Sequence, residues 1–169
     1  MRLFIASPVN ISDNMMEFLQ QINQFGNIRV PLIKNFHITY IFLGETDDNA
    51  LKEISMAIHK IPPVHIIAQI SKIAIFHNFR NSSAIVLVLD SPEFLTLYKE
   101  AIKTVPFPVK AKRQFIPHIT VGRTGKNVEN LDLTALKLPE ESIEINKICL
   151  YNSTLYSSGP VYEEIICNH

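Results

Sequence analysis

The apolar positions of the chain fall into short runs typical of strands and into longer segments with a helical period. Residues 2–6 and 36–43 predict two early strands, the second rich in β-branched and aromatic side chains. Residues 64–76 and 84–89 predict a hairpin. Three further strands are expected in the second half, at residues 118–123, 143–151 and 161–167.

Three amphipathic helices are expected between these strands. The first starts at Ser12 or Asp13 and ends near residue 26, and the second runs from Thr46 to about residue 59. The third is capped by Ser91 and ends near residue 103. This order of elements predicts an α+β fold with mostly antiparallel strand pairing. No break in composition divides the 169 residues, so one domain is expected.

Composition excludes several classes of protein. Apolar residues make up 47% of the chain and charged residues 19%, which provides a core and does not fit a disordered chain. The longest apolar run, residues 84–89, is far shorter than the roughly 20 residues of a membrane helix. The N-terminal segment lacks the apolar stretch of a signal peptide. A cytoplasmic protein with no membrane partner is therefore expected.

The two cysteines, Cys149 and Cys167, are too few for a disulfide framework and do not form a Cys-x-x-Cys metal motif. Both lie beside isoleucines in strand-like segments. They are therefore expected to be buried thiols of a reduced protein, with a role in packing.

Charge is balanced overall but unevenly distributed. The chain has 16 basic and 16 acidic side chains. Six basic residues and no acidic one lie between residues 101 and 128, whereas most of the charged residues after residue 128 are acidic. A neutral protein with one basic segment fits a small phosphate-bearing ligand better than a duplex, although an ordinary solvated surface shows the same pattern.

One tripeptide occurs twice in the chain. His-Ile-Thr at residues 37–39 recurs at residues 118–120, and both copies lie in predicted strands. Only about 0.3 His-x-Thr triplets are expected by chance in this composition, so two copies indicate a duplicated unit. Each half of the chain supplies one copy, as two pseudo-symmetric lobes would require.

The spacing within the motif has a structural meaning. Residues i and i+2 of a strand face the same side, so His37 projects with Thr39, and His118 projects with Thr120. The alternate positions of the two motifs are expected to face away from this site: Ile38, Tyr40, Ile119 and Val121.

Two imidazoles and two hydroxyls around one space suit a phosphate. The hydroxyls can donate to its oxygens while one histidine accepts a proton and the other donates one. The two copies look equivalent, so the pattern does not decide which histidine is the acid. Each histidine alone also fits a structural role or a metal ligand, although no carboxylate or third histidine follows at ligand spacing.

Longer strings around both copies resemble a known family. FHITYIFLGE at residues 36–45 and FIPHITVGR at residues 115–123, together with residues 2–8 and 148–165, resemble the two-histidine (2H) phosphoesterase superfamily. More narrowly, they resemble the RNA 2',3'-cyclic phosphodiesterases, long called 2'-5' RNA ligases. The resemblance implies one α+β domain over residues 1–169, with two pseudo-symmetric lobes of mostly antiparallel sheet, outer helices and an active cleft between the lobes.

The resemblance also implies a reaction. It is the hydrolysis of 2',3'-cyclic phosphate ends of RNA or nucleotides to 2'-phosphomonoesters, without metal or organic cofactor, with weak reverse 2'-5' ligation. His37 matches the proton donor of the family and His118 the proton acceptor. Thr39 and Thr120 match its phosphate-binding threonines. No protein partner is implied, and a monomer suffices.

Arg123 is a further candidate because it follows the second motif and can neutralise phosphate charge. Strict alternation puts it on the face opposite His118, so it reaches the site only if the strand ends or bulges after Gly122.

Residues 153–159 keep the serine and glycine pattern of the family and are expected to line the cleft. Many relatives have a tryptophan before the first motif, where this chain has residues 29–31 and no tryptophan.

Other residues are expected to have ordinary roles. The remaining histidines are expected at the surface, at caps, at a strand end or at a disordered terminus: His59, His65, His77 and His169. Four aromatic side chains offer faces to a base but are expected in the core: Phe42, Phe76, Tyr151 and Tyr156.

Two other functions stay open from the sequence. The same site would suit a phosphodiesterase that acts on 2'-5' oligoadenylate or on a cyclic phosphate of ADP-ribose. A protein that binds RNA ends without catalysis is the alternative from another class, although binding alone does not need two titratable groups.

Overall fold

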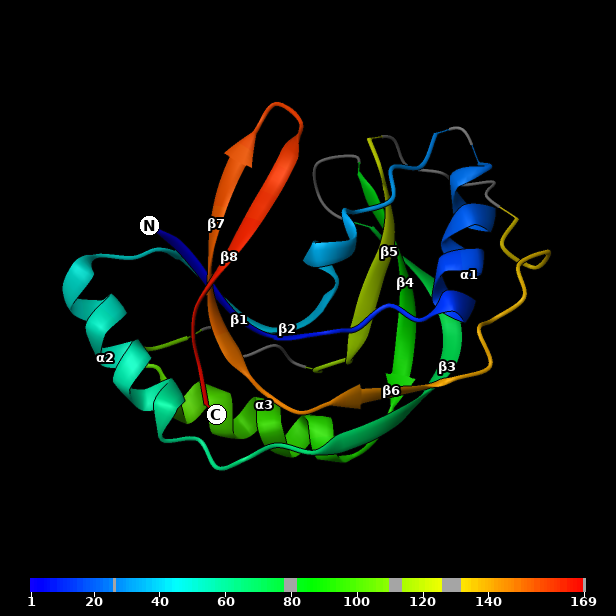
Figure 1. Cartoon of the computed structure of the whole chain (residues 1–169). Helices are drawn as coiled ribbons and strands as arrows, with labels where there is room; N and C mark the ends of the chain where they lie inside the picture. Colours follow the sequence, from blue (N-terminus) through cyan, green and yellow to red (C-terminus); the bar gives the residue numbers. More distant parts are fainter. Residues whose placement is uncertain (26, 78–81, 110–113, 126–131, 169) are drawn as a thin grey trace.

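The computed structural model describes residues 1–25, 27–77, 82–109, 114–125 and 132–168. Two four-stranded antiparallel sheets form the centre of the fold (Figure 1). Sheet A has the order β2-β1-β7-β8, and sheet B has the order β5-β4-β3-β6. The α+β prediction is confirmed, and every strand pair is antiparallel in the part of the chain that the structure describes. The strands are β1 (Arg2–Pro8), β2 (His37–Glu45), β3 (Ile66–His77), β4 (Ser83–Asp90), β5 (His118–Thr124), β6 (Ser142–Ile145), β7 (Cys149–Tyr156) and β8 (Gly159–Cys167).

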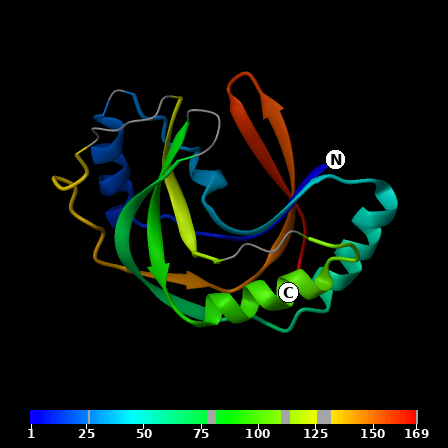
Figure 2. The ribbon, with the colours of Figure 1, turned by 180° about the vertical axis from the view of Figure 1, so that it is seen from behind.

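Three helices lie on the outside of the sheets, as expected. They are α1 (Asp13–Asn23), α2 (Asp48–His59) and α3 (Glu93–Thr104), and a short 3-10 helix, η1 (Ile33–Asn35), precedes β2. Helix α1 packs against β5 of sheet B, whereas α2 contacts β7 and β8 and α3 contacts β2 of sheet A (Figures 1 and 2). Each sheet is thus covered by a helix that follows a strand of the other sheet.

The two sheets contain the same strand–helix–strand unit. In β1-α1-β2 and in β4-α3-β5, an inner strand is followed by a helix and then by an edge strand. Both edge strands begin with the repeated His-Ile-Thr motif. Strands β2 and β5 also contact each other. The pseudo-symmetric lobes inferred from the sequence therefore bring the two motifs together along adjoining edges.

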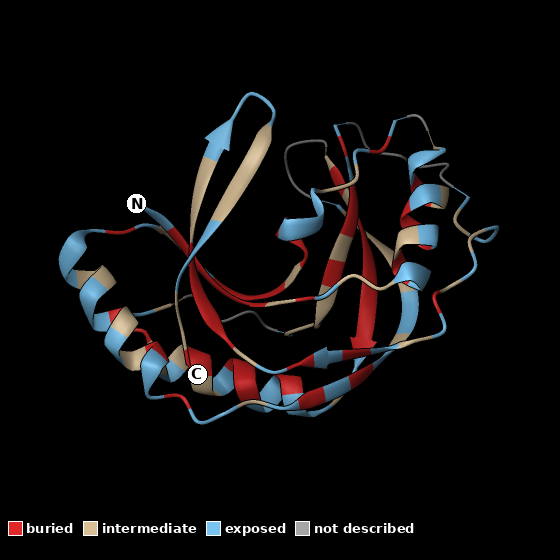
Figure 3. Ribbon diagram, viewed as in Figure 1, coloured by how far each residue is buried: buried red, intermediate tan, exposed pale blue. Residues whose placement is uncertain are grey.

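The main core is one continuous apolar cluster that both sheets and all three helices share. The four alternate motif positions are completely buried within it, as expected: Ile38, Tyr40, Ile119 and Val121. In Figure 3 the buried residues, coloured red, lie along strands of both sheets and on parts of the helices. Burying these side chains anchors the motif strands, because each fully buried apolar side chain contributes about 1.5–3 kcal/mol. The motif histidines and threonines must then face away from the core.

Two helix starts differ from the sequence prediction. Asp47, not Thr46, caps α2, and its carboxylate accepts a hydrogen bond from a backbone N–H at 2.8 Å. The Thr46 hydroxyl instead donates to a backbone carbonyl in the preceding turn. Ser91 does not cap α3, because its hydroxyl donates to the carboxylate of Glu93 and Pro92 occupies the cap position.

The prediction of one strand over residues 143–151 is wrong. The segment forms β6 in sheet B and β7 in sheet A, and residues 146–148 connect the two sheets. The Ser7 hydroxyl donates to the carbonyl of Lys147 at 2.6 Å, and the Asn168 side chain accepts from the backbone N–H of Ile148 at 3.0 Å. These side chains satisfy the backbone where the ladder is interrupted.

The prediction of free thiols is also wrong. Cys149 and Cys167 form a disulfide that joins β7 to β8. The two residues lie directly opposite each other in the strand pairing, and this places their side chains on one face of the sheet.

None of the helices in the described ranges is long and apolar enough to cross a membrane.

Candidate active site

His37 and His118 each stand at the first position of an edge strand. The Nδ1 of His37 lies 2.5 Å from the carbonyl oxygen of Asn35, and the Nδ1 of His118 lies 2.7 Å from that of Ile116. A carbonyl oxygen can only accept, so each Nδ1 carries a proton and donates it. In the neutral ring the Nε2 of each histidine is then the basic nitrogen.

Aromatic rings hold both imidazoles in place. The His37 ring lies 5.2 Å from the Phe4 ring and meets the Tyr162 ring edge-on at the same centroid distance. The His118 ring packs against Phe76 at 4.9 Å. Phe76 therefore supports a histidine of the site and is only partly buried.

The pKa of His37 is strongly lowered by its surroundings. Burial lowers the pKa of His37 to about 4, although its hydrogen bond to the carbonyl of Asn35 acts in the opposite direction. The positive charges of Arg123 and His118 lower this pKa further. His37 is therefore neutral at pH 7 in the ligand-free protein, and a bound anion would restore part of its affinity for a proton.

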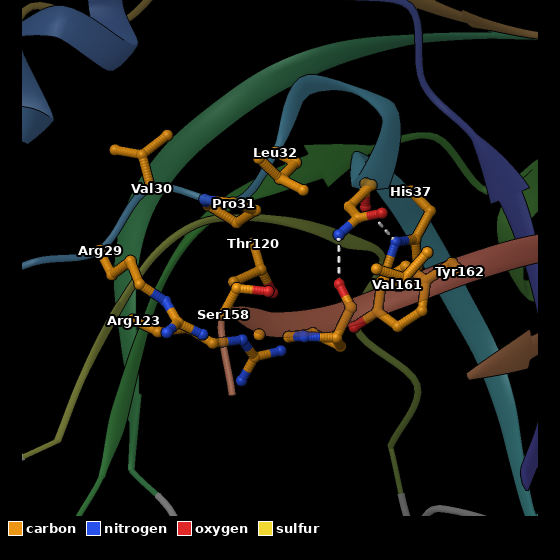
Figure 4. A pocket seen from close by; sticks show the side chains of 13 residues that line it. Arg29, Val30, Pro31, Leu32, His37, Thr120, Arg123, Ser158, Val161 and Tyr162 are labelled. Carbon is orange, nitrogen blue, oxygen red and sulfur yellow. Dashed lines mark hydrogen bonds between the residues drawn. The ribbon is translucent and has the colours of Figure 1, made fainter. Parts of the chain in front are cut away.

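A pocket of about 210 Å³ opens beside His37 (Figure 4). Its lining comes from residues 29–32, from Asn35 and His37, from Thr120 and Arg123 on β5, and from residues 158–162. The Asn35 amide donates to the carbonyl of Pro160 at 2.9 Å and so links the segment before β2 to the start of β8. Both lobes contribute to one site.

The predicted site residues occupy different depths. His37, Thr120 and Arg123 line the pocket. Thr39 is buried, with only 7% of its surface exposed, and does not belong to the pocket lining. His118 does not line this pocket, but its charge acts on His37.

Arg123 reaches the pocket through a β-bulge. In the pairing of β4 with β5, Thr120 lies opposite Val86 and Gly122 lies opposite Ile85, which leaves Val121 as an extra residue. The extra residue shifts the alternation, so Arg123 lies on the same face as Thr120. The sequence had placed the required irregularity after Gly122, and the bulge occurs one residue before it.

Sequence reasoning did not single out three lining residues, Arg29, Asn35 and Tyr162. Arg29 pairs with Arg123 in an isolated bridge between backbones. Asn35 and Tyr162 touch His37 directly. Only the position of Asn35, two residues before a motif histidine, was a signal in the sequence.

Other expectations have mixed outcomes. Ser158 and Gly159 line the pocket, as expected of residues 153–159, and Tyr151 is buried. Phe42 and Tyr156 are exposed, so the expectation that they belong to the core is wrong. The remaining histidines lie away from the pocket lining: His59 ends α2, His65 contacts Asn146, and the Nδ1 of His77 lies 2.8 Å from the Ser83 hydroxyl. His169 lies outside the described residues.

A cluster of potential metal ligands lies outside the pocket. Within the described ranges, the one group of three that could hold an ion is Cys149, Glu164 and Cys167, and its two sulfurs form the disulfide. Neither motif histidine belongs to such a group. The pocket lining offers an imidazole, hydroxyls and guanidinium groups.

The chain is similar in sequence to known proteins over nearly its whole length. The RNA 2',3'-cyclic phosphodiesterase of Methanocaldococcus jannaschii is 32% identical, with 98% of each chain covered. The protein of the same name from Thermotoga maritima is 29% identical, with 96% of this chain and 92% of the relative covered.

Solved structures share the fold. TT0787 of Thermus thermophilus superposes with a TM-score of 0.75 at 21% identity, covering 99% of this chain and 96% of the other. E. coli LigT in complex with 3'-AMP superposes with a TM-score of 0.69 at 20% identity, covering 98% and 95%. The sequence pattern of the 2'-5' RNA ligase superfamily matches residues 11–155, and the chain belongs to this superfamily.

Proposed function

We propose that the chain hydrolyses 2',3'-cyclic phosphate ends of RNA to 2'-phosphomonoesters. One observation carries the proposal: two histidines on adjoining edge strands each donate Nδ1–H to a carbonyl, which makes Nε2 the basic nitrogen of each neutral ring. The names of the full-length relatives support the choice of substrate. The reaction needs one copy of the chain, because one chain carries both motifs. A cytoplasmic location stays a prediction from the sequence.

The proposed step is an in-line displacement at phosphorus. The Nε2 of His118 accepts a proton from water as the water oxygen bonds to phosphorus. The bond from phosphorus to the 3'-oxygen breaks, and His37 donates a proton to that oxygen. Thr39 and Thr120 are the proposed ligands of the non-bridging phosphate oxygens, and Arg123 neutralises phosphate charge from the neighbouring part of the pocket.

The acid role of His37 requires a change on binding. With a pKa of about 4 the free imidazole is unprotonated at pH 7. The negative charge of the cyclic phosphate favours the protonated ring, so substrate and proton bind together. This coupling between substrate binding and protonation of His37 can be measured directly.

A phosphorus NMR time course tests the function. The substrate is an oligonucleotide with a 2',3'-cyclic phosphate end, incubated with the protein in EDTA. We expect the 2'-phosphomonoester as the only product. Activity that appears only after a divalent ion is added would mean that the histidines act as ligands, and the mechanism would be wrong. The absence of turnover under both conditions would favour 2'-5' oligoadenylate, an ADP-ribose cyclic phosphate or binding alone.

A further inference from the structure

Two arginines face each other at the pocket. Arg29 and Arg123 exchange both backbone hydrogen bonds, at 2.8 and 2.9 Å, in an antiparallel bridge beside the free edge of β5. Side chains of such directly opposed residues project to the same side. Both guanidinium groups line the pocket (Figure 4).

This pair lacks the counter-charge that usually accompanies it. Both side chains are exposed, and within the described ranges neither guanidinium has a carboxylate at ion-pair distance. Like charges directly opposite each other in a sheet are destabilising. An anion between them would remove this repulsion, because guanidinium groups bind phosphate oxygens with paired hydrogen bonds.

The turn before β8 leaves room for the Arg29 side chain. Gly159 has a φ of +122°, and a Cβ at this position would lie only 2.9 Å from the Nη2 of Arg29. A larger residue would therefore force the guanidinium of Arg29 to move. The glycine allows Arg29 to lie against the turn while its backbone stays paired with Arg123.

The arginines and His37 occupy different parts of the pocket. Figure 4 shows the two guanidinium groups toward one side, His37 toward the other, and Thr120 between them. A phosphate that reacts beside His37 leaves the Arg29 side of the pocket for a second anionic group. A nucleotide is of the right kind, since it can carry one phosphate on each side of its ribose.

We propose that Arg29, together with Arg123, forms a subsite for a second phosphate, on the 5' side of the nucleoside that carries the cyclic phosphate. The inference rests on the proposed function, because it takes the reacting phosphate to lie at the histidines. Its chemistry is met by the adjacent phosphodiester of an RNA chain, by a 5'-phosphate or by the diphosphate of ADP-ribose. The subsite selects ends with this second phosphate over a simple nucleoside cyclic phosphate.

Steady-state kinetics on four substrates tests the subsite. They are adenosine 2',3'-cyclic phosphate with a 5'-hydroxyl, the same compound with a 5'-phosphate, the dinucleotide ending in a cyclic phosphate, and ADP-ribose cyclic phosphate. We expect Arg29→Gln to lower kcat/KM about tenfold more for a two-phosphate substrate than for the 5'-hydroxyl compound, chiefly through KM. Arg29→Lys should recover part of the loss.

The control is Arg2→Gln, which removes the same charge from the exposed first residue of β1. Arg2→Gln should have the same kcat/KM as the wild type on every substrate. The substrate with the largest selective loss identifies the source of the second phosphate. An equal loss on all four substrates, or no loss on any, would overturn the subsite.

A binding measurement distinguishes a failure of the subsite from a failure of the proposed function. Calorimetry compares adenosine 2'-phosphate with adenosine 2',5'-bisphosphate for the wild type and for Arg29→Gln. Selectively weaker binding of the bisphosphate by the variant supports the subsite even if no substrate is hydrolysed, in which case only the proposed function fails. Equal binding of the bisphosphate by both proteins overturns the subsite even if hydrolysis proceeds.

Discussion

His37 and His118 make the same contact in two different lobes: each Nδ1 meets the carbonyl oxygen two residues earlier, at 2.5 and 2.7 Å. The repeated contact follows from the repeated fold, since each histidine is the first residue of an edge strand. Their surroundings then differ, because His37 is packed between Phe4 and Tyr162 while His118 packs against Phe76. Equivalent geometry in unequal surroundings suits an acid and a base.

Removal of either histidine should abolish most of the activity. We expect His37→Ala and His118→Ala each to lower kcat by about 10²–10⁴-fold, the usual contribution of general acid–base catalysis. The double variant should lose less than the product of the two, because the residues act in one step. His65→Ala is the control, since this exposed histidine contacts Asn146 and Glu144 away from the pocket. Near-normal turnover in either motif variant would refute the mechanism.

The pKa of His37 should depend on the ligand. In the free protein, burial lowers it to about 4, so the ring is neutral above that pH. Binding of inorganic phosphate should raise the pKa, because a nearby anion stabilises the charged ring. Imidazole resonances followed by NMR across pH 3–8, assigned with His37→Ala, give both values. A ligand-free value near 6.5, the ordinary value for histidine, would contradict the effect of burial.

The motif was predictable because strand geometry is local. An alternating pattern places His37 with Thr39 and buries Ile38, and no long-range information is needed. Strand breaks were harder to foresee. Among residues 143–151 the alternate burial of Ile143 and Ile145 gives way to the continuous buried run 148–151, and this change marks the passage between sheets.

The features that sequence reasoning missed depend on contacts between distant segments. Arg29 joins the site only because its backbone pairs with Arg123, almost a hundred residues away. Cys149 meets Cys167 only because the β7-β8 register makes them partners. Hydrophobic periodicity fixes which face of a strand is buried, whereas the residue opposite a given position also depends on strand order and turn geometry, so neither pair could be derived from periodicity alone.

Gly122 should be intolerant of any side chain. A Cβ at this position would lie 2.5 Å from the Cγ2 of Ile28, the residue before Arg29. We expect Gly122→Ala to lower the free energy of unfolding by about 1–3 kcal/mol, the usual cost of overpacking, and to raise KM by displacing Arg29. Urea denaturation measures the first effect and steady-state kinetics the second.

Two further variants identify the cause of that loss. Ile28→Ala removes the Cγ2 atom, so it should offset much of the effect of Gly122→Ala in a double-mutant cycle. Gly125→Ala is the matched control, because a Cβ there has nothing within 4 Å. If Gly125→Ala were as destabilising as Gly122→Ala, or if the two effects at Gly122 and Ile28 simply added, the contact would not be the reason.

The disulfide should stabilise the fold without taking part in the reaction. It joins residues 18 positions apart in the sequence, for which restriction of the unfolded chain contributes about 3 kcal/mol. It lies at the end of the β7-β8 hairpin away from Gly159 and the pocket, so kcat should change little on reduction. Reductant should therefore lower the denaturation midpoint of the wild type, whereas a Cys149→Ala, Cys167→Ala double variant should have a low midpoint that reductant does not change. Two alkylatable thiols in the unreduced wild type would show instead that the cysteines are unpaired.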